Sequence, residues 1–452
     1  MRDHLDPTPY RVAIVTLDRH AAGSAARALP ALRKDFGDLD VSVHAAAEWG
    51  ETPEALHAAK DAVMRADIIV VTLLFLEDHV QAILPELRAR RAGCDALFGL
   101  ISDSQITSLT KAGDLDMSAP TSPAMTLLKK LKPKAKGAKS GESQMKTLRR
   151  LPKILRFIPG KAQDLRAYFL SMQYWLGGTD ENIREMLRYL VSRYTKRPEW
   201  QNIEADAPRE YPDVGLYHPD LPGKGITEDL ADLRKGDGPT VGLLLMRSYV
   251  LSGDAAHYNA VIRAFEAKGL SVIPAFAGGL DARPAVDAYF KEGAIDALVS
   301  LTGFSLVGGP AYNDSPAAVD MLSDLDVPYV AAHPLEFQTI EQWEASSQGL
   351  GPVETTMLIA LPEIDGATNP TVFAGRHDAS AGQPYRDMSP CVERVAALVD
   401  KTSRLVRLRR KDNAEKTLAI TVFGFPPNAG AVGTAAYLSV FESLYHTLHR
   451  LK

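Results

Sequence analysis

The sequence predicts an α/β protein built from two parallel-sheet domains, with a helical insert and a basic linker between them. In residues 1–118, and again in residues 239–411, short runs of Val, Ile, Leu and Ala alternate with amphipathic helical patterns. Such alternation is typical of a parallel sheet with helices on its faces, as in Rossmann-like and flavodoxin-like domains. The chain has 452 residues, 46% of them hydrophobic, which is enough for two to four domains with substantial cores.

The composition excludes several classes of protein. The longest apolar runs, such as Ile68–Leu76, are far shorter than the roughly 20 residues of a membrane-spanning helix. The first residues, MRDHLDPTPYR, contain no apolar signal core. The two cysteines, Cys94 and Cys391, are far apart and have no nearby Cys or His, so we expect neither a disulfide framework nor a sulfur metal site. A reducing cytoplasm fits these features best.

Residues 119–162 are interpreted as a basic linker. From Lys129 to Lys161 there are twelve Lys or Arg and one acidic residue, although the whole chain carries a net charge of −5. Prolines and glycines break any long helix here, which favours a solvated linker. The only aromatic residue is Phe157, so base stacking on nucleic acid has little support. Weak membrane association through the basic side chains is a secondary possibility.

The first α/β domain is expected within residues 1–118. The predicted strands are Arg11–Leu17, Val41–Ala45, Asp67–Phe75 and Ala96–Ser102, and the predicted helices are Ala21–Asp35, Pro53–Arg65 and Glu77–Arg91. No Gly-x-Gly-x-x-Gly follows a strand, so a dinucleotide site has no support. A scaffold or docking role is the simplest expectation for this domain.

Residues 163–197 predict an antiparallel helix pair, and residues 198–238 a Pro-rich connector. Apolar residues recur at helical spacing on both sides of Gly177-Gly178. The aromatic side chains of the first helix could line a flat ligand, but core packing is the more common role of such a stripe. His218, in the run GLYHP, could bind a metal; a hydrogen-bonded structural histidine is favoured because no second ligand is spaced to join it.

The second α/β domain, residues 239–411, gathers the candidate site. Loops that follow parallel strands meet at one edge of the sheet, which is where ligands of such folds bind. Polar side chains follow several of the predicted strands, and these could line a common cleft: Ser252, Asp254, His257, Thr302, His333, Glu336, Glu363, Asp365 and Arg376. The Gly-rich loop from Gly303 to Gly308 is not followed by Gly-Lys-Ser/Thr, so ATP hydrolysis by this chain is unsupported.

Met357–Arg376 is the stretch most suggestive of chemistry. The apolar run Met357–Leu361 predicts a short buried strand that Pro362 ends, and Val372–Ala374 predicts another. Glu363 and Asp365 lie between them and Arg376 follows the second strand. The alternative is an ordinary acidic turn in which Asp365-Gly366 makes the bend, because Asp-Gly is a common turn pair.

The last segment, residues 412–452, predicts a strand at Leu418–Phe425 and a helix at Ala435–Leu451. One strand and one helix cannot bury both of their faces, so this segment is expected to begin a further domain of a longer protein. Pairing of the strand with the sheet of the second domain is the alternative.

Several runs resemble one known family and occur in the same order as in that family. They are KAQDLRAYFLSMQYWLGGTDENI (161–183), GLYHP (215–219), SGDAAHYNAVIRAFEAKGLSVIPAFAGGLD (252–281), TGFSLVGGPAYND (302–314), HPLEFQTIEQW (333–343), LPEIDG with NPTVFAGR (361–376) and LAITVFGFPPNAGAVGTAAYL (418–438). The chain resembles the N-terminal part of the large, porphyrin-binding subunits of magnesium chelatases, and is more distantly similar to the large subunits of cobaltochelatases.

The resemblance implies a porphyrin-binding subunit of a metal-inserting enzyme in (bacterio)chlorophyll biosynthesis. It implies protoporphyrin IX and Mg²⁺ as substrates, and two smaller partner subunits, a AAA+ ATPase and its companion, that hydrolyse ATP. By residue chemistry, Glu363 and Asp365 are candidate proton acceptors or transient Mg²⁺ ligands, Arg376 is a candidate propionate-binding residue, and His333 and Glu336 are candidate substrate contacts; no resident metal ligand is assigned. A cobaltochelatase subunit and a non-catalytic binding or docking module remain the alternatives.

Overall fold

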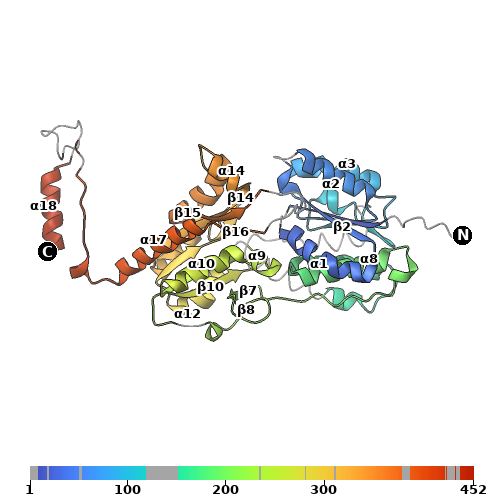
Figure 1. Ribbon diagram of the computed structural model, residues 1–452, viewed down its shortest axis with the longest axis horizontal. Coiled ribbons are helices and arrows are strands. Elements are labelled where there is room, and N and C mark those ends of the chain that lie inside the picture. The colour runs from blue at the N-terminus through green and yellow to red at the C-terminus, as the bar shows by residue number, and fades with distance from the viewer. Residues whose placement is uncertain are drawn as a thin grey trace. The chain divides into compact units, whose positions relative to one another are not determined.

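The computed structural model describes residues 9–17, 20–49, 53–118, 151–233, 236–279, 281–309, 312–378, 387–422, 424, 433 and 438–452. The chain divides into two compact units, Met1–Ser403 and Arg404–Lys452. The larger unit contains two mostly parallel sheets covered by helices, which confirms the predicted α/β class (Figure 1). The finer domain boundaries stay a prediction, and most of the basic linker lies outside the described residues.

The first sheet has the strand order β2-β1-β3-β4-β5-β6. Its strands are β1 (Tyr10–Thr16), β2 (Leu39–Ala45), β3 (Ile68–Thr72), β4 (Ala96–Leu100), β5 (Lys111–Ala112) and β6 (Leu115–Asp116). The first four are parallel and the last two turn back antiparallel. The residues of β3 and β4 are all buried because helices cover both faces, as the continuous apolar runs predict.

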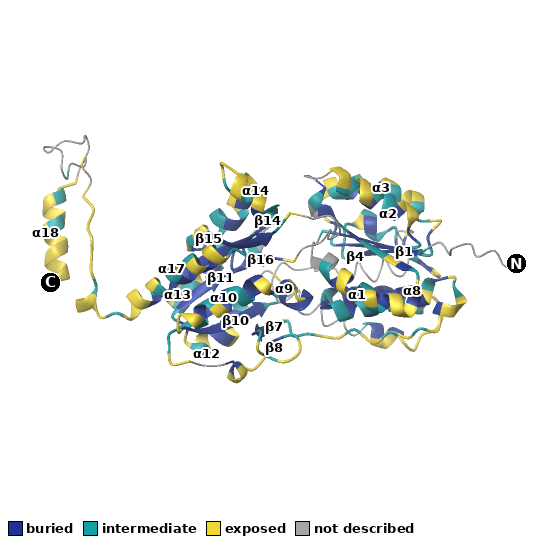
Figure 2. Ribbon diagram, in the orientation of Figure 1, coloured by how far each residue is buried: buried dark blue, intermediate teal, exposed yellow. Residues whose placement is uncertain are grey.

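Two sets of helices cover the first sheet. Helices α2 (Pro53–Arg65) and α3 (Glu77–Arg90) pack on one face, and α1 (His20–Phe36) packs on the other. Short helical turns complete this part: η1 (Ala46–Glu48) and α4 (Ser104–Thr107). Figure 2 shows the strands buried and the outward faces of the helices exposed.

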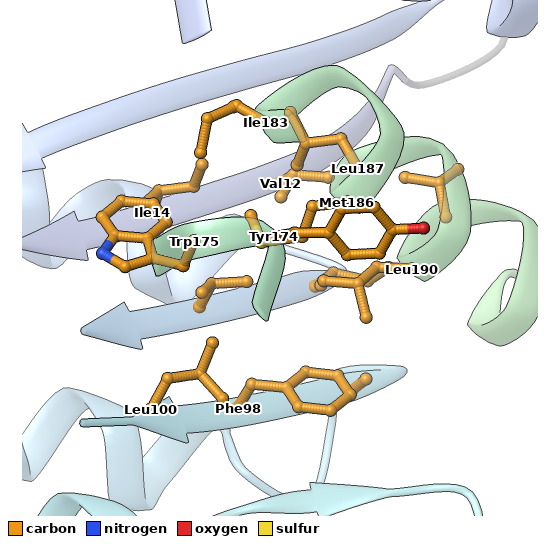
Figure 3. Packing of buried hydrophobic residues seen from close by; sticks show 14 of the residues in the cluster. Val12, Ile14, Phe98, Leu100, Tyr174, Trp175, Ile183, Met186, Leu187 and Leu190 are labelled. Carbon is orange, nitrogen blue, oxygen red and sulfur yellow. The ribbon is translucent and has the colours of Figure 1, made fainter. Parts of the chain in front are cut away.

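The predicted helix pair packs against the first sheet. Helices α7 (Lys161–Gly177) and α8 (Asp180–Tyr194) lie beside α1 and share its buried cluster, in which Trp175, Met186 and Leu187 face strand residues such as Ile14 and Phe98 (Figure 3). The Tyr168 hydroxyl donates a hydrogen bond to the Gly99 carbonyl in β4 (3.0 Å). The aromatic stripe is therefore core, as favoured from the sequence, and the pair completes this face of the sheet.

A buried carboxylate ties the pair to the end of the first sheet. Asp164 in α7 accepts hydrogen bonds from Arg193 Nη2 (2.8 Å), from the Tyr194 hydroxyl (3.0 Å) and from the backbone N–H of Asp114 between β5 and β6 (2.9 Å). Because a buried charge is stable only when it is paired and hydrogen-bonded, these contacts fix how the two helices meet the β5–β6 turn.

The second sheet has the order β16-β15-β14-β11-β9-β10-β7-β8. Its central strands are parallel: β9 (Thr240–Met246), β10 (Ser271–Ala277), β11 (Ala297–Ser300), β14 (Tyr329–Thr339) and β15 (Thr368–Arg376). Antiparallel strands β16 (Ser389–Pro390), β7 (Val214–Tyr217) and β8 (Ile226–Thr227) form its edges. The Pro-rich segment, predicted as an extended connector, thus supplies two edge strands.

Helices and short turns surround the second sheet. They are η3 (Leu230–Asp232), α9 (Arg247–Ser252), α10 (Ala256–Ala267), α11 (Arg283–Ala285), the π-helical η4 (Val286–Phe290), α12 (Lys291–Gly293), α13 (Ser315–Leu325), α14 (Ile340–Ala345), α15 (Pro352–Glu354) and α17 (Val392–Arg410), with the small hairpin β12 (Gly308–Gly309) and β13 (Tyr312–Asn313). The turn η2 (Pro198–Trp200) instead belongs to the first sheet, where Trp200 packs against Tyr10 and Phe36. The residues of η4 and α13 pack on one face of the sheet.

The strand predicted at Met357–Leu361 is wrong. These residues belong to the π-helix η5 (Thr355–Ala360) and to α16 (Leu361–Ile364), which continue α15 without a break, and Pro362 lies near the end of this helical segment. An apolar run of five residues does not distinguish a strand from a half-buried helix. The predicted Asp365-Gly366 bend is confirmed, since Gly366 has φ +110°.

The second unit, from Arg404 onward, has a much smaller core. It contains the end of α17, η6 (Asn413–Glu415) and α18 (Val440–Leu451), and α18 has no buried residue. The strand predicted at Leu418–Phe425 is absent from residues 418–422, which form no ladder, whereas Gly424 lies in a β-bridge. The helix predicted from Ala435 is present over the Val440–Leu451 range.

We predict that Leu187→Ala, in the fully buried face of α8, lowers the free energy of unfolding of the whole first domain by about 2–5 kcal/mol, because it leaves a cavity in the cluster shared with the sheet. Urea unfolding, followed by hydrogen exchange of the β1 amides, measures this. Normal protection of β1 in the variant, with only the helix pair destabilised, would show that the pair is a separate insert.

Candidate functional site

Five parallel strands of the second sheet end at the same edge and carry the candidate site there. In space their order is β10, β9, β11, β14, β15. The chain adds β10 on one side of β9 and then β11, β14 and β15 on the other side, so the strand order reverses at a switch point between β9 and β11. In open parallel sheets, the crevice outside the carboxyl ends of the strands at such a switch point is where ligands bind. The polar residues that follow β9, β14 and β15 meet at this edge.

Asp254 is the most buried carboxylate at this edge. Helix α9, directly after β9, ends at Gly253 in the left-handed region (φ +78°) and brings Asp254 back beneath the strand ends. Asp254 is 2% exposed. Its Oδ1 accepts a hydrogen bond from the backbone N–H of Met388 (2.7 Å), and its Oδ2 lies 3.5 Å from Arg376 Nη2. The carboxylate therefore links the segment before β16 to the end of β15.

Arg376, the last residue of β15, lies between two carboxylates. Besides Asp254, its Nη1 is 3.6 Å from Glu336 Oε2 on β14, and its guanidinium carbon is 6.0 Å from the centre of the Tyr249 ring. Glu336 also accepts a hydrogen bond from the Tyr249 hydroxyl (2.5 Å). Burial, with the charge of Glu336, raises the pKa of Tyr249 well above its usual value, so its hydroxyl stays a donor.

The described charged groups of this cluster, Asp254, Glu336 and Arg376, sum to a negative formal charge. Two carboxylates and one guanidinium give −1, and Arg376 is only 9% exposed. Of the three charged groups, Glu336 has the most exposed side chain. The group best placed to meet a ligand is therefore a carboxylate, and the arginine is positioned to hold that carboxylate in place.

Two buried histidines lie nearby in the fold. His257, in α10, stacks against Tyr258 (ring centroids 3.9 Å apart) and against Phe373 (5.8 Å). His333, in β14, is 1% exposed, and neither ring nitrogen has a hydrogen-bond partner among the residues that the structure describes. Burial lowers the pKa of His333 to about 4, so the ring is neutral near pH 7. Both are core residues.

A small cavity marks the switch point itself. Its volume is ≈ 30 Å³, room for one or two water molecules. It is lined from the ends of β9 and β10 and from the loop after β11, by Leu244, Leu245, Met246, Ala277, Gly279, Asp281, Ala282, Thr302, Phe304, Ser305, Leu306 and Gly308. The lining is mostly apolar, which suits the edge of a hydrocarbon or aromatic group better than a phosphate.

Asp365 and Glu363 lie away from the cluster around Arg376, although Asp365 contacts two residues that line the cavity. Both carboxylates precede β15, whereas Arg376 ends it, and eight residue steps of strand span roughly 25 Å. Asp365 is buried and accepts hydrogen bonds from the Ser305 hydroxyl (2.5 Å), the Leu306 N–H (3.0 Å) and the Ser315 hydroxyl (2.9 Å). It braces the Gly-rich loop that lines the cavity. Glu363 is exposed on α16.

His218 is hydrogen-bonded on both ring nitrogens. Its Nε2 lies 3.0 Å from Glu266 Oε1, and its Nδ1 accepts a hydrogen bond from the N–H of Asp220. This supports the structural role favoured from the sequence. Among the described residues, no group of three His, Cys, Asp or Glu side chains is arranged to hold a metal ion.

Tyr249 is a member of the site that the sequence pattern did not predict. The sequence feature that could have indicated Tyr249 is its position in the first turns after β9, between the end of that strand and the candidate residues Ser252 and Asp254. A tyrosine in an apolar setting usually packs in the core, and only its contact with Glu336, 87 residues away, gives it another role.

The sequence profile of the CobN/Magnesium Chelatase family matches residues 172–452, and a domain of unknown function matches residues 11–169. The chain belongs to the CobN/magnesium chelatase family. The H protein of magnesium chelatase from Cereibacter sphaeroides is 61% identical over 98% of this chain and 39% of its own length. The chloroplastic magnesium-chelatase protein ChlH of Oryza sativa is 40% identical over 86% of this chain and 29% of its own length.

A solved structure shows the same fold. The catalytic subunit of cobaltochelatase from Mycobacterium tuberculosis matches 98% of this chain and 31% of its own with a TM-score of 0.56, at 17% sequence identity. Among the sequence relatives, the magnesium-chelatase protein from Cereibacter is longer than this chain, which spans about 39% of its length. In the part of the chain that the structure describes, no helix is long and apolar enough to cross a membrane.

We predict that Asp365→Ala lowers the free energy of unfolding by about 3 kcal/mol, because two hydroxyls and one N–H lose a buried acceptor. Glu363→Ala, two residues away and exposed, should change it by less than about 0.5 kcal/mol. Urea unfolding of both variants measures the difference. Equal, small effects would mean that Asp365 is not a structural brace.

We predict a pH dependence of stability from His333. Its pKa is about 4 in the folded protein and about 6.5 when unfolded, so between these values the unfolded chain binds more protons. Stability should therefore fall as pH drops from about 6.5 to about 4, by about 3 kcal/mol for this residue. Urea unfolding of the native chain and of His333→Leu at pH 7 and pH 4 isolates the contribution of this histidine, because the variant should lose less stability on acidification. An identical loss in both proteins would show that His333 does not cause the pH dependence.

Proposed function

We propose that this chain is part of the large subunit of a magnesium chelatase. In this proposal the protein binds protoporphyrin IX in the cytoplasm and presents it for Mg²⁺ insertion, while two smaller partner subunits hydrolyse ATP, in (bacterio)chlorophyll biosynthesis. The observation that carries the proposal is the 61% identity to the H protein of a magnesium chelatase over 98% of the chain. At 40% identity the plant relative also bears the magnesium-chelatase name.

The chemistry of insertion sets what the protein must supply. A flat apolar macrocycle must be held, two pyrrole N–H protons must be accepted, and a strongly hydrated cation must be delivered, preferably to oxygen atoms. The carboxyl edge of the second sheet supports part of this task. There, Glu336 is a half-buried carboxylate held by the Tyr249 hydroxyl and by Arg376, which suits it to accept a proton or contact a cation.

We assign the proton-accepting or Mg²⁺-contacting role at this edge to Glu336, rather than to Asp365 or Glu363. Three hydrogen bonds already occupy the Asp365 carboxylate, and Glu363 lies near the opposite end of β15. The formal charge of −1 around Arg376 favours a cation or an N–H donor as the ligand group, since a propionate would add a second net negative charge to a largely buried cluster. Arg376 then orients Glu336, and His333 supports β14 from the core.

We predict that Glu336→Gln weakens binding of a soluble protoporphyrin analogue by about tenfold or more, because it removes a charged hydrogen-bond acceptor of the ligand. Quenching of tryptophan fluorescence in a titration measures the affinity, and insertion assays with the complete enzyme measure activity. Glu363→Gln is the matched control and should bind normally.

The opposite pattern, with Glu363→Gln impaired and Glu336→Gln normal, would place the contact at the amino end of β15. Saturable binding that neither substitution changes would remove both carboxylates from the porphyrin site. If the folded native chain shows no saturable quenching, the porphyrin site of the whole protein lies outside this chain.

A further inference from the structure

The first domain makes a polar contact with the segments that carry the candidate site. Arg27, on α1, forms an ion pair with Asp387, with Nη1 3.0 Å from Oδ2. The Arg27 Nη2 atom also donates a hydrogen bond to the Ser252 carbonyl at the end of α9. One guanidinium therefore joins two segments of the second domain, the end of α9 and the residues just before β16.

Gly23, one turn earlier on α1, makes this approach possible. A Cβ atom at residue 23 would lie 2.8 Å from Asp387 Oδ1 and 3.3 Å from Arg27 Nη1. The first distance is shorter than any normal carbon–oxygen contact, so a side chain at residue 23 would displace Asp387. The lack of a side chain at Gly23 and the guanidinium of Arg27 together form a binding position for the Asp387 carboxylate on α1.

Asp387 and Ser252, the two partners of Arg27, are both connected to the candidate site around Glu336. Asp387 is followed by Met388, whose buried backbone N–H donates to Asp254 Oδ1 (2.7 Å). Asp254 in turn contacts Arg376, and Arg376 contacts Glu336. On the other side, α9 ends at Ser252 and carries Tyr249, which donates to the same Glu336. Both segments that Arg27 joins therefore converge on Glu336.

We propose that Arg27 is a positioning residue for the candidate site, so that the first domain sets the geometry of Asp254, Arg376 and Glu336 in the second. The inference rests on the proposed function for the identity of the ligand, but the coupling itself does not. It gives a role to residues 11–169, which the family comparison matches to a domain of unknown function. The side chains of Arg27 and Asp387 are 36% and 47% exposed, and ion pairs this exposed contribute little to overall stability. Their effect is expected on the site and not on folding.

The test compares Arg27→Ala, Arg27→Lys and Gly23→Ala in the full chain, with Lys34→Ala, an exposed residue of the same helix, as control. Hydrogen exchange of the peptide that covers Met388 is the first readout. It should speed up about fivefold or more in Arg27→Ala and in Gly23→Ala, less in Arg27→Lys, and not in Lys34→Ala. The Gly23→Ala variant is informative because alanine favours the helix, so slower folding or lower stability is not expected from it.

Porphyrin affinity is the second readout. It should fall about fivefold in Arg27→Ala and Gly23→Ala and recover partly in Arg27→Lys, with the midpoint of thermal unfolding unchanged. Unchanged Met388 exchange in Arg27→Ala and Gly23→Ala would overturn the coupling whether or not the chain binds porphyrin. Faster exchange with no porphyrin binding by the native chain would keep the coupling and reject the proposed ligand.

Discussion

The parallel register of the second sheet is the constraint on which the site depends. Because β9, β10, β11, β14 and β15 all run in one direction, the segments that follow them leave from one edge, although more than 100 residues separate Tyr249 from Arg376 along the chain. An antiparallel strand in the middle of this sheet would send one of these loops to the far edge. The register therefore brings a tyrosine, two carboxylates and an arginine together without any local sequence motif.

Burial then decides what that cluster can do. Burial alone would lower the pKa of Arg376, but its neighbours Tyr249, Glu336 and Asp254 raise that pKa above its usual value, so they stabilise the buried guanidinium charge. Since the arginine is already engaged by both Asp254 and Glu336, a ligand would meet the cluster at the half-buried Glu336. Asp365 shows the contrasting case: a carboxylate whose three hydrogen bonds fix a loop and leave it little capacity for a substrate.

The sequence could predict the α/β class because the strands are short apolar runs separated by amphipathic helices, and the helix Pro53–Arg65 has the predicted bounds. It could not resolve Met357–Leu361, because five apolar residues fit a strand and a helix equally well. The loop rule grouped Asp254, Glu336, Arg376 and Asp365 as candidates, and the structure brings the first three together. Asp365 instead accepts hydrogen bonds from Ser305, Leu306 and Ser315, which are 50 to 60 residues away along the chain, so no local pattern could reveal that it braces a loop.

The central claim is that the carboxyl edge of the second sheet faces the substrate. The most direct measurement is hydrogen exchange of the full chain with and without a soluble protoporphyrin analogue, resolved by peptide. We predict added protection in the segments that follow β9 and β11, which include Tyr249 and Thr302, and in the carboxyl half of β14, which includes Glu336, and none around Glu363. Protection confined to the first domain or to the helix that holds Glu363, with no change at the strand ends, would contradict it.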